Sequence, residues 1–125
     1  MNPFWLKHII SACPLKIQRV EWNDPQLTIG GSDWHFNAIA PWRLFDWKKL
    51  IIGSDDKGFE AAIKKLVGLD ITDCLTSQRA IDPCFILSNG QRLEFFSTCA
   101  LEPWTMKLSE APILVASPGD PKWSI

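Results

Sequence analysis

Alternating apolar and polar residues recur along most of the 125-residue chain, and this period of two predicts strands. The clearest case is the stretch 34–40, where every second residue is apolar and shares one face: Trp34, Phe36, Ala38 and Ala40. Pro41 then interrupts the ladder because it has no amide donor, so 42–53 is a further strand or a bent pair. Weaker alternation predicts further strands in the following stretches: 15–22, 26–29, 69–76, 83–88, 104–108 and 111–119.

Two segments change to a helical period. In the first, the apolar positions are Trp5, Leu6, Ile9, Ile10 and Cys13, and the run begins at Asn2 and Pro3 and stops at Pro14. In the second, they are Phe59, Ala62, Ile63, Leu66 and Val67. We expect Ser54, Asp55 or Asp56 to cap this second helix and Gly68 to end it in the left-handed conformation.

The sequence "FILSNGQRLEFF" predicts a hairpin, because Asn89-Gly90 is the preferred dipeptide of a two-residue type I′ turn. That turn pairs Ser88 with Gln91 and sets which side chains face the core: Cys84, Ile86, Leu93 and Phe95. Glu94 falls on the other, mixed face, and Arg92 on the same face is its expected partner.

Together these elements predict one α+β domain over residues 1–125, a mostly antiparallel sheet or two packed sheets with one or two helices. The chain has seven tryptophans and no tyrosine. Most of the tryptophans should be core, because each buries a large area. Trp42, Trp47 and Trp123 lie near breaks in the alternation, where an exposed indole would suit a binding hot spot.

Charge and composition exclude several classes of protein. A net charge of −1 argues against nucleic-acid binding, which needs clustered Lys and Arg. No apolar run has the length of a membrane span or the form of a signal peptide, so we expect a cytoplasmic protein without a membrane partner. The four cysteines, at 13, 74, 84 and 99, form no C-x-x-C pair, which favours buried free thiols over a metal site or a disulfide.

Candidate chemistry is sparse, and we expect no catalytic residue, no metal and no cofactor. His8 lies opposite the apolar stripe of the first helix and should be exposed. A cysteine-dependent hydrolase would have to pair His35 with Cys84 or Cys99. The remaining carboxylates have structural interpretations as helix caps and turn residues, and no phosphate-binding glycine loop is present.

The order of "LTIGGSDWHF", "PWRLF", "IIGSDD", "LVGLDITDC", "FILSNGQRLEFFST" and "EPWTMKL" resembles a family of small bacterial proteins of unknown function. Some of these serve as immunity proteins in polymorphic-toxin or contact-dependent inhibition systems. The similarity covers residues 26 to 108 and implies a shared fold; it assigns no catalytic residue.

The sequence therefore favours a non-catalytic binding protein, an immunity protein that neutralises a cognate toxin by direct contact. Acidic residues at predicted breaks would recognise a basic toxin surface, with Trp42 or Trp47 as an aromatic anchor. The candidate binding residues are Asp24, Asp33, Trp42, Trp47, Asp55, Asp56 and Glu102. The alternatives are a homo-oligomeric assembly module and the small cysteine hydrolase.

Overall fold

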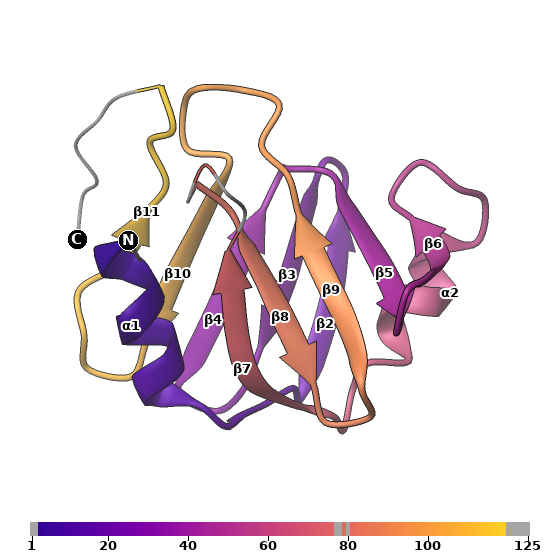
Figure 1. Cartoon of the computed structure of the whole chain (residues 1–125), viewed down its shortest axis with the longest axis horizontal. Helices are drawn as coiled ribbons and strands as arrows, with labels where there is room; N and C mark the ends of the chain where they lie inside the picture. Colours follow the sequence, from indigo (N-terminus) through magenta and orange to yellow (C-terminus); the bar gives the residue numbers. More distant parts are fainter. Residues whose placement is uncertain (1–2, 77–78, 80, 120–125) are drawn as a thin grey trace.

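Two antiparallel sheets pack face to face in the computed structural model, which describes residues 3–76, 79 and 81–119 (Figure 1). Sheet A has six strands in the order β1 (Leu15–Lys16), β7 (Asp70–Thr76), β8 (Pro83–Leu87), β9 (Gln91–Phe95), β5 (Trp42–Asp46) and β6 (Lys49–Gly53). Sheet B has five, in the order β11 (Leu114–Val115), β10 (Trp104–Leu108), β4 (Trp34–Ala38), β3 (Gln26–Gly30) and β2 (Arg19–Asn23).

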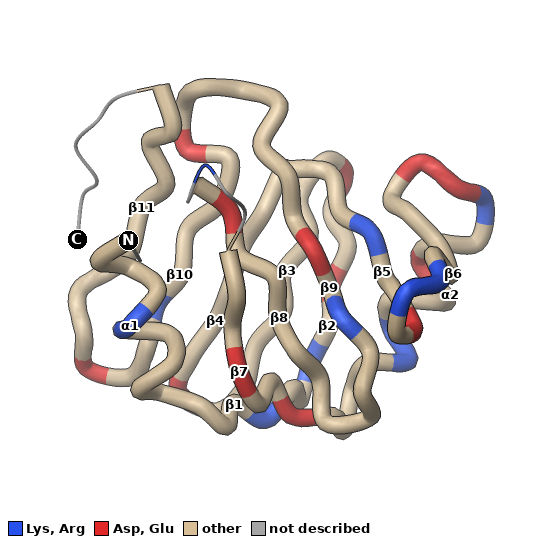
Figure 2. Tube along the Cα trace, viewed as in Figure 1, with Lys and Arg blue, Asp and Glu red and all other residues tan. Residues whose placement is uncertain are grey.

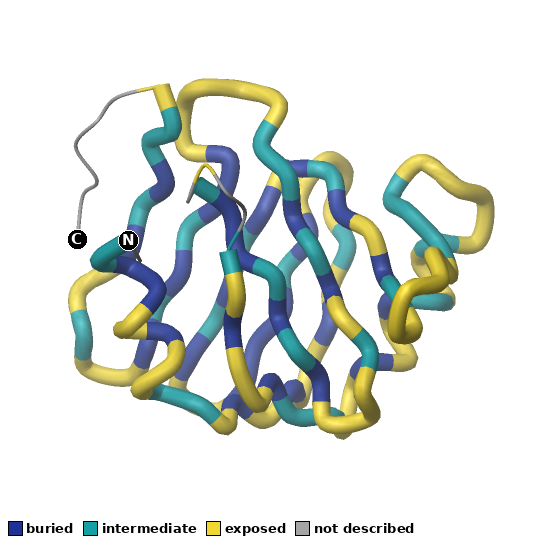
Figure 3. The backbone as a smooth tube through the Cα atoms, viewed as in Figure 1, coloured by how far each residue is buried: buried dark blue, intermediate teal, exposed yellow. Residues whose placement is uncertain are grey.

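The core lies between the sheets and is built by the inward residues of alternating strands. Phe36 of β4 stands at its centre, with its ring centroid 5.0 Å from Phe85, 4.8 Å from Phe95 and 5.6 Å from Trp104. Buried and more exposed positions alternate along β4, β8 and β10 (Figure 3). The alternation read from the sequence is therefore the alternation between core and outer face.

Two helices close the open sides of the sandwich. On one side, α1 (Phe4–Ala12) packs against β7, and its Trp5 ring lies 5.2 Å from Trp104 in the other sheet. On the opposite side, α2 (Phe59–Lys64) lies beside β6, and Phe59 contacts Trp22 at 5.0 Å (Figure 1). Each helix thus seals the apolar layer at an edge that the strands leave open.

The predicted strand 15–22 divides between the two sheets. Leu15 and Lys16 pair with β7, whereas residues 19–23 pair with β3. The change occurs between two neighbouring amides, because Ile17 donates to Leu69 O at 2.9 Å and Gln18 donates to Gly30 O at 2.8 Å. The alternation of this segment is imperfect because its two halves belong to different sheets.

The β8–β9 hairpin forms where it is predicted, but its register is shifted by one residue. Ile86 pairs with Arg92 and Phe85 with Leu93. The predictions that Ile86 is buried and that Cys84 faces the core are wrong, since the buried positions of β8 are Pro83, Phe85 and Leu87.

The turn explains the shift. A type I′ turn needs positive φ at both central residues, but of Asn89 and Gly90 only Gly90 has it, with φ of 90°. Its amide donates to Leu87 O at 2.9 Å, and the Asn89 side chain accepts from Gln91 N at 3.0 Å, giving a three-residue loop.

The α2 segment is helical as predicted but shorter, and its start is different. Gly58, with φ of 81°, occupies the N-cap, and no side chain caps the helix. The predicted caps are wrong because the Asp56 carboxylate accepts instead from Gly53 N, at 2.8 Å. Gly68 does take the expected left-handed conformation, with φ of 98°.

The remaining strands agree with the alternation, and 42–53 is the bent pair β5–β6. The last strand is reduced to Leu114–Val115. Two packed antiparallel sheets are confirmed, and their strand content outweighs the α+β label. Asn2, the predicted start of the first helix, and Trp123, a candidate exposed indole, lie outside the described residues.

The outer faces of the two sheets differ in chemistry. On sheet B, Gln26, Thr28 and Asn37 form a hydrogen-bonded polar group, with Thr28 Oγ1 2.7 Å from Asn37 Oδ1. On sheet A, charged residues of β5 and β9 lie beside half-buried apolar side chains (Figure 2). Among the described residues, no helix covers the middle of this second face in Figure 1.

Candidate functional site

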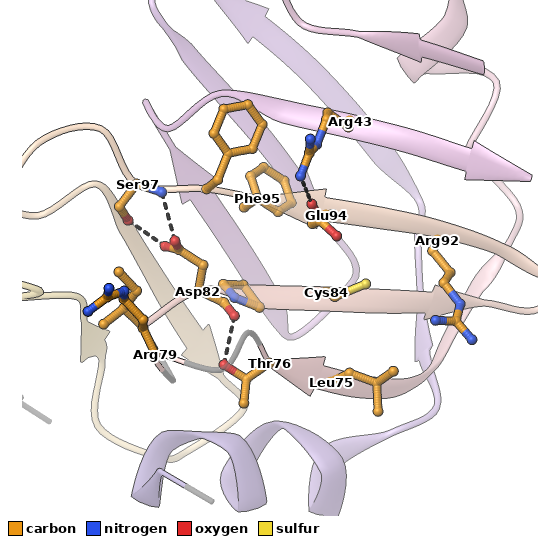
Figure 4. Close-up of a pocket in the computed structure, with 13 residues that line it drawn as sticks. Arg43, Leu75, Thr76, Arg79, Asp82, Cys84, Arg92, Glu94, Phe95 and Ser97 are labelled. Atoms are coloured by element: carbon orange, nitrogen blue, oxygen red, sulfur yellow. Dashed lines mark hydrogen bonds and ion pairs between the residues drawn. The ribbon is translucent and has the colours of Figure 1, made fainter. Parts of the chain in front are cut away.

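A hollow of about 490 Å³ lies on the outer face of sheet A (Figure 4). Its most buried polar group is Asp82, only 5% exposed, which accepts hydrogen bonds from the Ser97 hydroxyl and, at 2.7 Å, from Ser97 N. Thr76 Oγ1 donates to the Asp82 carbonyl at 2.9 Å. These bonds tie the start of β8 to the segment after β9 and leave the carboxylate satisfied.

The second carboxylate in this hollow, Glu94, is paired with Arg43 of the neighbouring strand. The prediction that Arg92 pairs with Glu94 is wrong, because Arg43 lies directly opposite Glu94 in the β5–β9 register. The guanidinium of Arg43 also lies 4.8 Å from the centroid of Phe96 and 5.6 Å from that of Phe45. Both acidic groups of the hollow are thus held by neighbouring side chains.

Cys84 is the thiol in the lining of this hollow, but its surroundings suppress the thiolate. Burial raises the pKa of the Cys84 thiol to about 11, nearby Glu94 adds to the rise, and Arg92 opposes it. The base proposed for it is on the other side of the molecule. Phe85 and Phe36 meet in the core, so the adjacent Cys84 and His35 point outward from opposite sheets.

The other thiols are also free, and they differ in exposure. Burial raises the pKa of Cys74 above its usual range, and burial with help from Asp73 raises the pKa of Cys13 to about 11. Cys99 is exposed, so the expectation of a buried thiol is wrong there. Within residues 3–76, 79 and 81–119, no group of His, Cys, Asp and Glu has the arrangement of a metal site.

Four of the five acidic candidates gather at one end of the sandwich. Asp24 lies in the β2–β3 turn, Asp55 and Asp56 in the β6–α2 loop, and Glu102 before β10, and all four are exposed. The register places these connections at the Ala38 end of β4. Asp33 lies at the opposite end, where its carbonyl accepts from Ser109 N, so the structure does not bring it into the group.

Ile39 stands at the centre of this end, 47% exposed, with a hollow on each side. The first hollow, of about 140 Å³, has Pro25 and Asp55 in its lining; the second, of about 210 Å³, has Glu102. Both Ile39 N and Ala40 N donate to the Pro103 carbonyl, which fixes the strand end beside the Glu102 segment. We call Ile39, Asp24, Asp55, Asp56 and Glu102 the acidic end.

The two tryptophan candidates have opposite environments. Trp42 is 1% exposed, so its proposed role as an exposed anchor is wrong; it faces the core beneath the first hollow, with its ring 6.2 Å from Phe59. Trp47 is 76% exposed at the tip of the β5–β6 hairpin. The β5–β6 and β5–β9 registers place Trp47 at the end of sheet A that lies farthest from the acidic end. Trp47 and the acidic end therefore do not form one site.

Backbone strain marks two of the candidates. Trp47 and Glu102 have φ of 61° and 45°, a conformation that residues other than glycine adopt rarely. Residues held in such conformations cluster at functional sites.

Ile39 is the site residue that the binding prediction missed. The sequence carried a signal for it, since Ile39 shares the alternation of His35 and Asn37 and is an apolar residue on a polar face.

Comparison with known proteins finds no matching family model, curated protein or solved structure. Across the described parts of the chain, none of the helices has the length and apolar character needed to span a membrane.

Proposed function

We propose that this protein is a non-catalytic immunity protein that neutralises a bacterial toxin by binding a basic surface of that toxin at the acidic end. One observation carries the proposal: Asp55 and Glu102, from two separate connections, line the hollows on either side of the exposed Ile39, and Asp24 lies in a third connection, next to Pro25 of the first hollow. An apolar centre within a charged rim is the usual anatomy of a protein interface.

The rigid frame supports this assignment. The three connections leave β2, β6 and the segment before β10, and the adjoining strands belong to the packed sandwich. Loops mounted on such a scaffold hold their side chains in place before a partner arrives, which lowers the entropy lost on binding. The left-handed backbone at Glu102 is consistent with a residue held for contact.

The nature of the partner follows from charge. A toxin that cleaves nucleic acid presents a basic cleft, because the phosphate backbone attracts Lys and Arg. Carboxylates that occupy such a cleft would exclude the substrate and would speed encounter at low salt. The resemblance to immunity proteins supports a toxin as this partner, and an interface of about 800 Å² per partner is typical.

The test is co-expression with a candidate toxin from a neighbouring gene, followed by gel filtration of the pair at low salt. We expect the wild type to restore growth and to elute with the toxin. The double variant Asp24→Lys, Glu102→Lys should lose most of the binding, because both changes place positive charge against a basic surface.

Asp33→Lys is the matched control, since it reverses an exposed acidic residue at the opposite end of the molecule. It should bind as the wild type does. Equal binding by the double variant and the control would place the contact elsewhere, and no growth rescue together with no complex would refute the toxin partnership for that pair.

A further inference from the structure

Two arginines on the outer face of sheet A have opposite neighbours. Arg43 of β5 lies opposite Glu94 and forms an ion pair with it. Arg92 of β9 lies between Phe45 on one side and Ile86 on the other, so both of its neighbours across the sheet are apolar. Arg92 is exposed, and no ion pair joins it to another described residue. Its guanidinium is therefore open to an anion from outside the chain.

Arg92 lines two hollows that adjoin each other. One is the hollow of about 490 Å³ on the outer face of sheet A, and the other, of about 270 Å³, reaches the tip of the β5–β6 hairpin, where Trp47 and Lys48 line it. Both hollows have Cys84 and Glu94 in their linings, so they form one groove across the sheet face (Figure 4). Its size is in the range of small-molecule sites. We call these two adjoining hollows the arginine groove.

The arginine groove has an excess of positive charge. Its lining has four cationic side chains and two carboxylates: Arg43, Arg79, Arg92 and Lys48, against Asp82 and Glu94. Both carboxylates are already engaged, Asp82 by Ser97 and Glu94 by Arg43. The Cys84 thiol adds no negative charge at neutral pH, because burial raises its pKa to about 11. The charge of the described lining therefore favours an anionic ligand.

The smaller hollow of the groove also has aromatic walls. Phe45 and Trp47 line it, and Trp47 is 76% exposed, so its indole can stack on a flat ring from outside the chain. The left-handed backbone of Trp47, with φ of 61°, is the kind of strain found at ligand sites. Lys48 lines the same hollow and, like Arg92, forms no ion pair with a described residue. Cationic and aromatic groups thus meet within one hollow.

We propose that the arginine groove binds a mononucleotide, with the base against Trp47 and the phosphate on Arg92 and Lys48. Phosphate oxygens match the planar guanidinium of arginine, which can bind two of them through parallel hydrogen bonds. An aromatic base can stack on an indole whatever its hydrogen-bonding pattern. A mononucleotide has both groups in one small molecule, whereas inorganic phosphate lacks the ring and a nucleoside lacks the charge.

Isothermal titration calorimetry of the full chain with adenosine monophosphate at low salt tests the site. We expect the mononucleotide to bind at one site per chain. Adenosine and inorganic phosphate should each bind at least about tenfold more weakly, because each lacks one of the two contacts. Added salt should weaken the binding of the mononucleotide, since Arg92 and Lys48 are exposed.

Variants of the exposed residues separate the two contacts. Arg92→Gln should weaken binding of the mononucleotide by at least about tenfold, because it removes the guanidinium that holds the phosphate. Trp47→Ala should weaken it by a similar factor through loss of stacking and should leave the affinity for inorganic phosphate unchanged. Arg19→Gln is the matched control, since it removes an exposed arginine of β2 in the other sheet, and it should bind as the wild type does. Thermal denaturation of every variant establishes that the fold is intact.

This inference goes beyond the proposed function and can fail without it. Asp24 and Glu102, the residues reversed in the toxin-binding test, are absent from the described lining of the arginine groove. A protein that binds toxin but no mononucleotide would remove only the groove, and one that binds the mononucleotide but no toxin would remove only the immunity role.

The mononucleotide site itself has clear contrary results. No binding by the wild type at about 1 mM ligand would overturn it, as would equal affinity for inorganic phosphate and the mononucleotide. An equal loss of binding in Arg19→Gln would reduce the effect to general surface attraction and would also overturn the site. A short single strand of nucleic acid that binds where the mononucleotide does not would replace the small ligand by a polymer.

Discussion

The β8–β9 and β5–β6 hairpins lie in the same sheet, and they reverse the chain with opposite chemistry. In the first, Gly90 takes the left-handed position of the turn, with φ of 90°, and the tip is polar. In the second, Trp47 takes a left-handed position, with φ of 61°, and the tip exposes an indole. The left-handed backbone of the first turn is occupied by glycine, which adopts it readily. The left-handed backbone of the second is occupied by tryptophan, which adopts it rarely.

This difference separates residues that serve folding from residues that serve contact. A left-handed backbone costs a residue with a β-carbon about 1–2 kcal/mol relative to glycine. The side chain at Trp47 gains little in return within the chain, since it is 76% exposed. The hairpin that carries this indole is also the one whose outer strand, β6, has no described strand on its other side.

The largest expected effect comes from truncating the matched leucines of the two hairpins. Leu93 of β9 is fully buried, so Leu93→Ala should lower the free energy of unfolding by about 3 kcal/mol. Leu50 of β6 is 50% exposed, and Leu50→Ala should change it by less than about 1 kcal/mol. Urea denaturation of both variants measures the contrast, and equal losses would show that β6 is packed like β9.

A smaller loss is expected at the turn of the first hairpin. Gly90→Val should destabilise the protein by about 1–2 kcal/mol, because a β-branched residue resists the left-handed conformation. No atom lies within 4 Å of the position that a Cβ would take there, so the loss is backbone strain alone. Thermal denaturation is the measurement, and an unchanged melting temperature would contradict the turn conformation.

The smallest change, and of opposite sign, is expected at the second tip. Trp47→Gly should raise the free energy of unfolding by about 0.5 kcal/mol, since relief of the left-handed strain exceeds the added entropy of the unfolded chain. Denaturant unfolding measures this change. A loss of stability would mean that the indole packs within its own chain.

The sequence predicts most elements of this fold because alternation is a local property of each strand. In β4, Trp34, Phe36 and Ala38 repeat every second residue and all three are buried. The register of a strand pair is harder to predict from the sequence. One additional loop residue at Ser88–Gly90 moves Ile86 from the predicted core to the outer face.

The site is harder to predict than the fold because it depends on which connections meet in space. Asp24, Asp55 and Glu102 belong to separate parts of the sequence. The pairing of β3, β4 and β10 brings the loops of Asp24 and Glu102 to one end, and the pairing of β5 with β6 in the other sheet brings the loop of Asp55 there. Trp42 and Trp47 both lie near breaks in the pattern, yet one is core and the other is exposed. The sequence distinguishes them poorly, because Pro41 hides the alternation that would place Trp42 inside.

The contact between α1 and β10 has a consequence for the order in which a growing chain can fold. Trp5 packs against Trp104, which lies far along the described chain, and β4 has β10 as its outer neighbour. On the ribosome, the contact between Trp5 and Trp104 cannot form until β10 has emerged. Because contacts between residues so distant in sequence form slowly, this part of the core should be among the last to close.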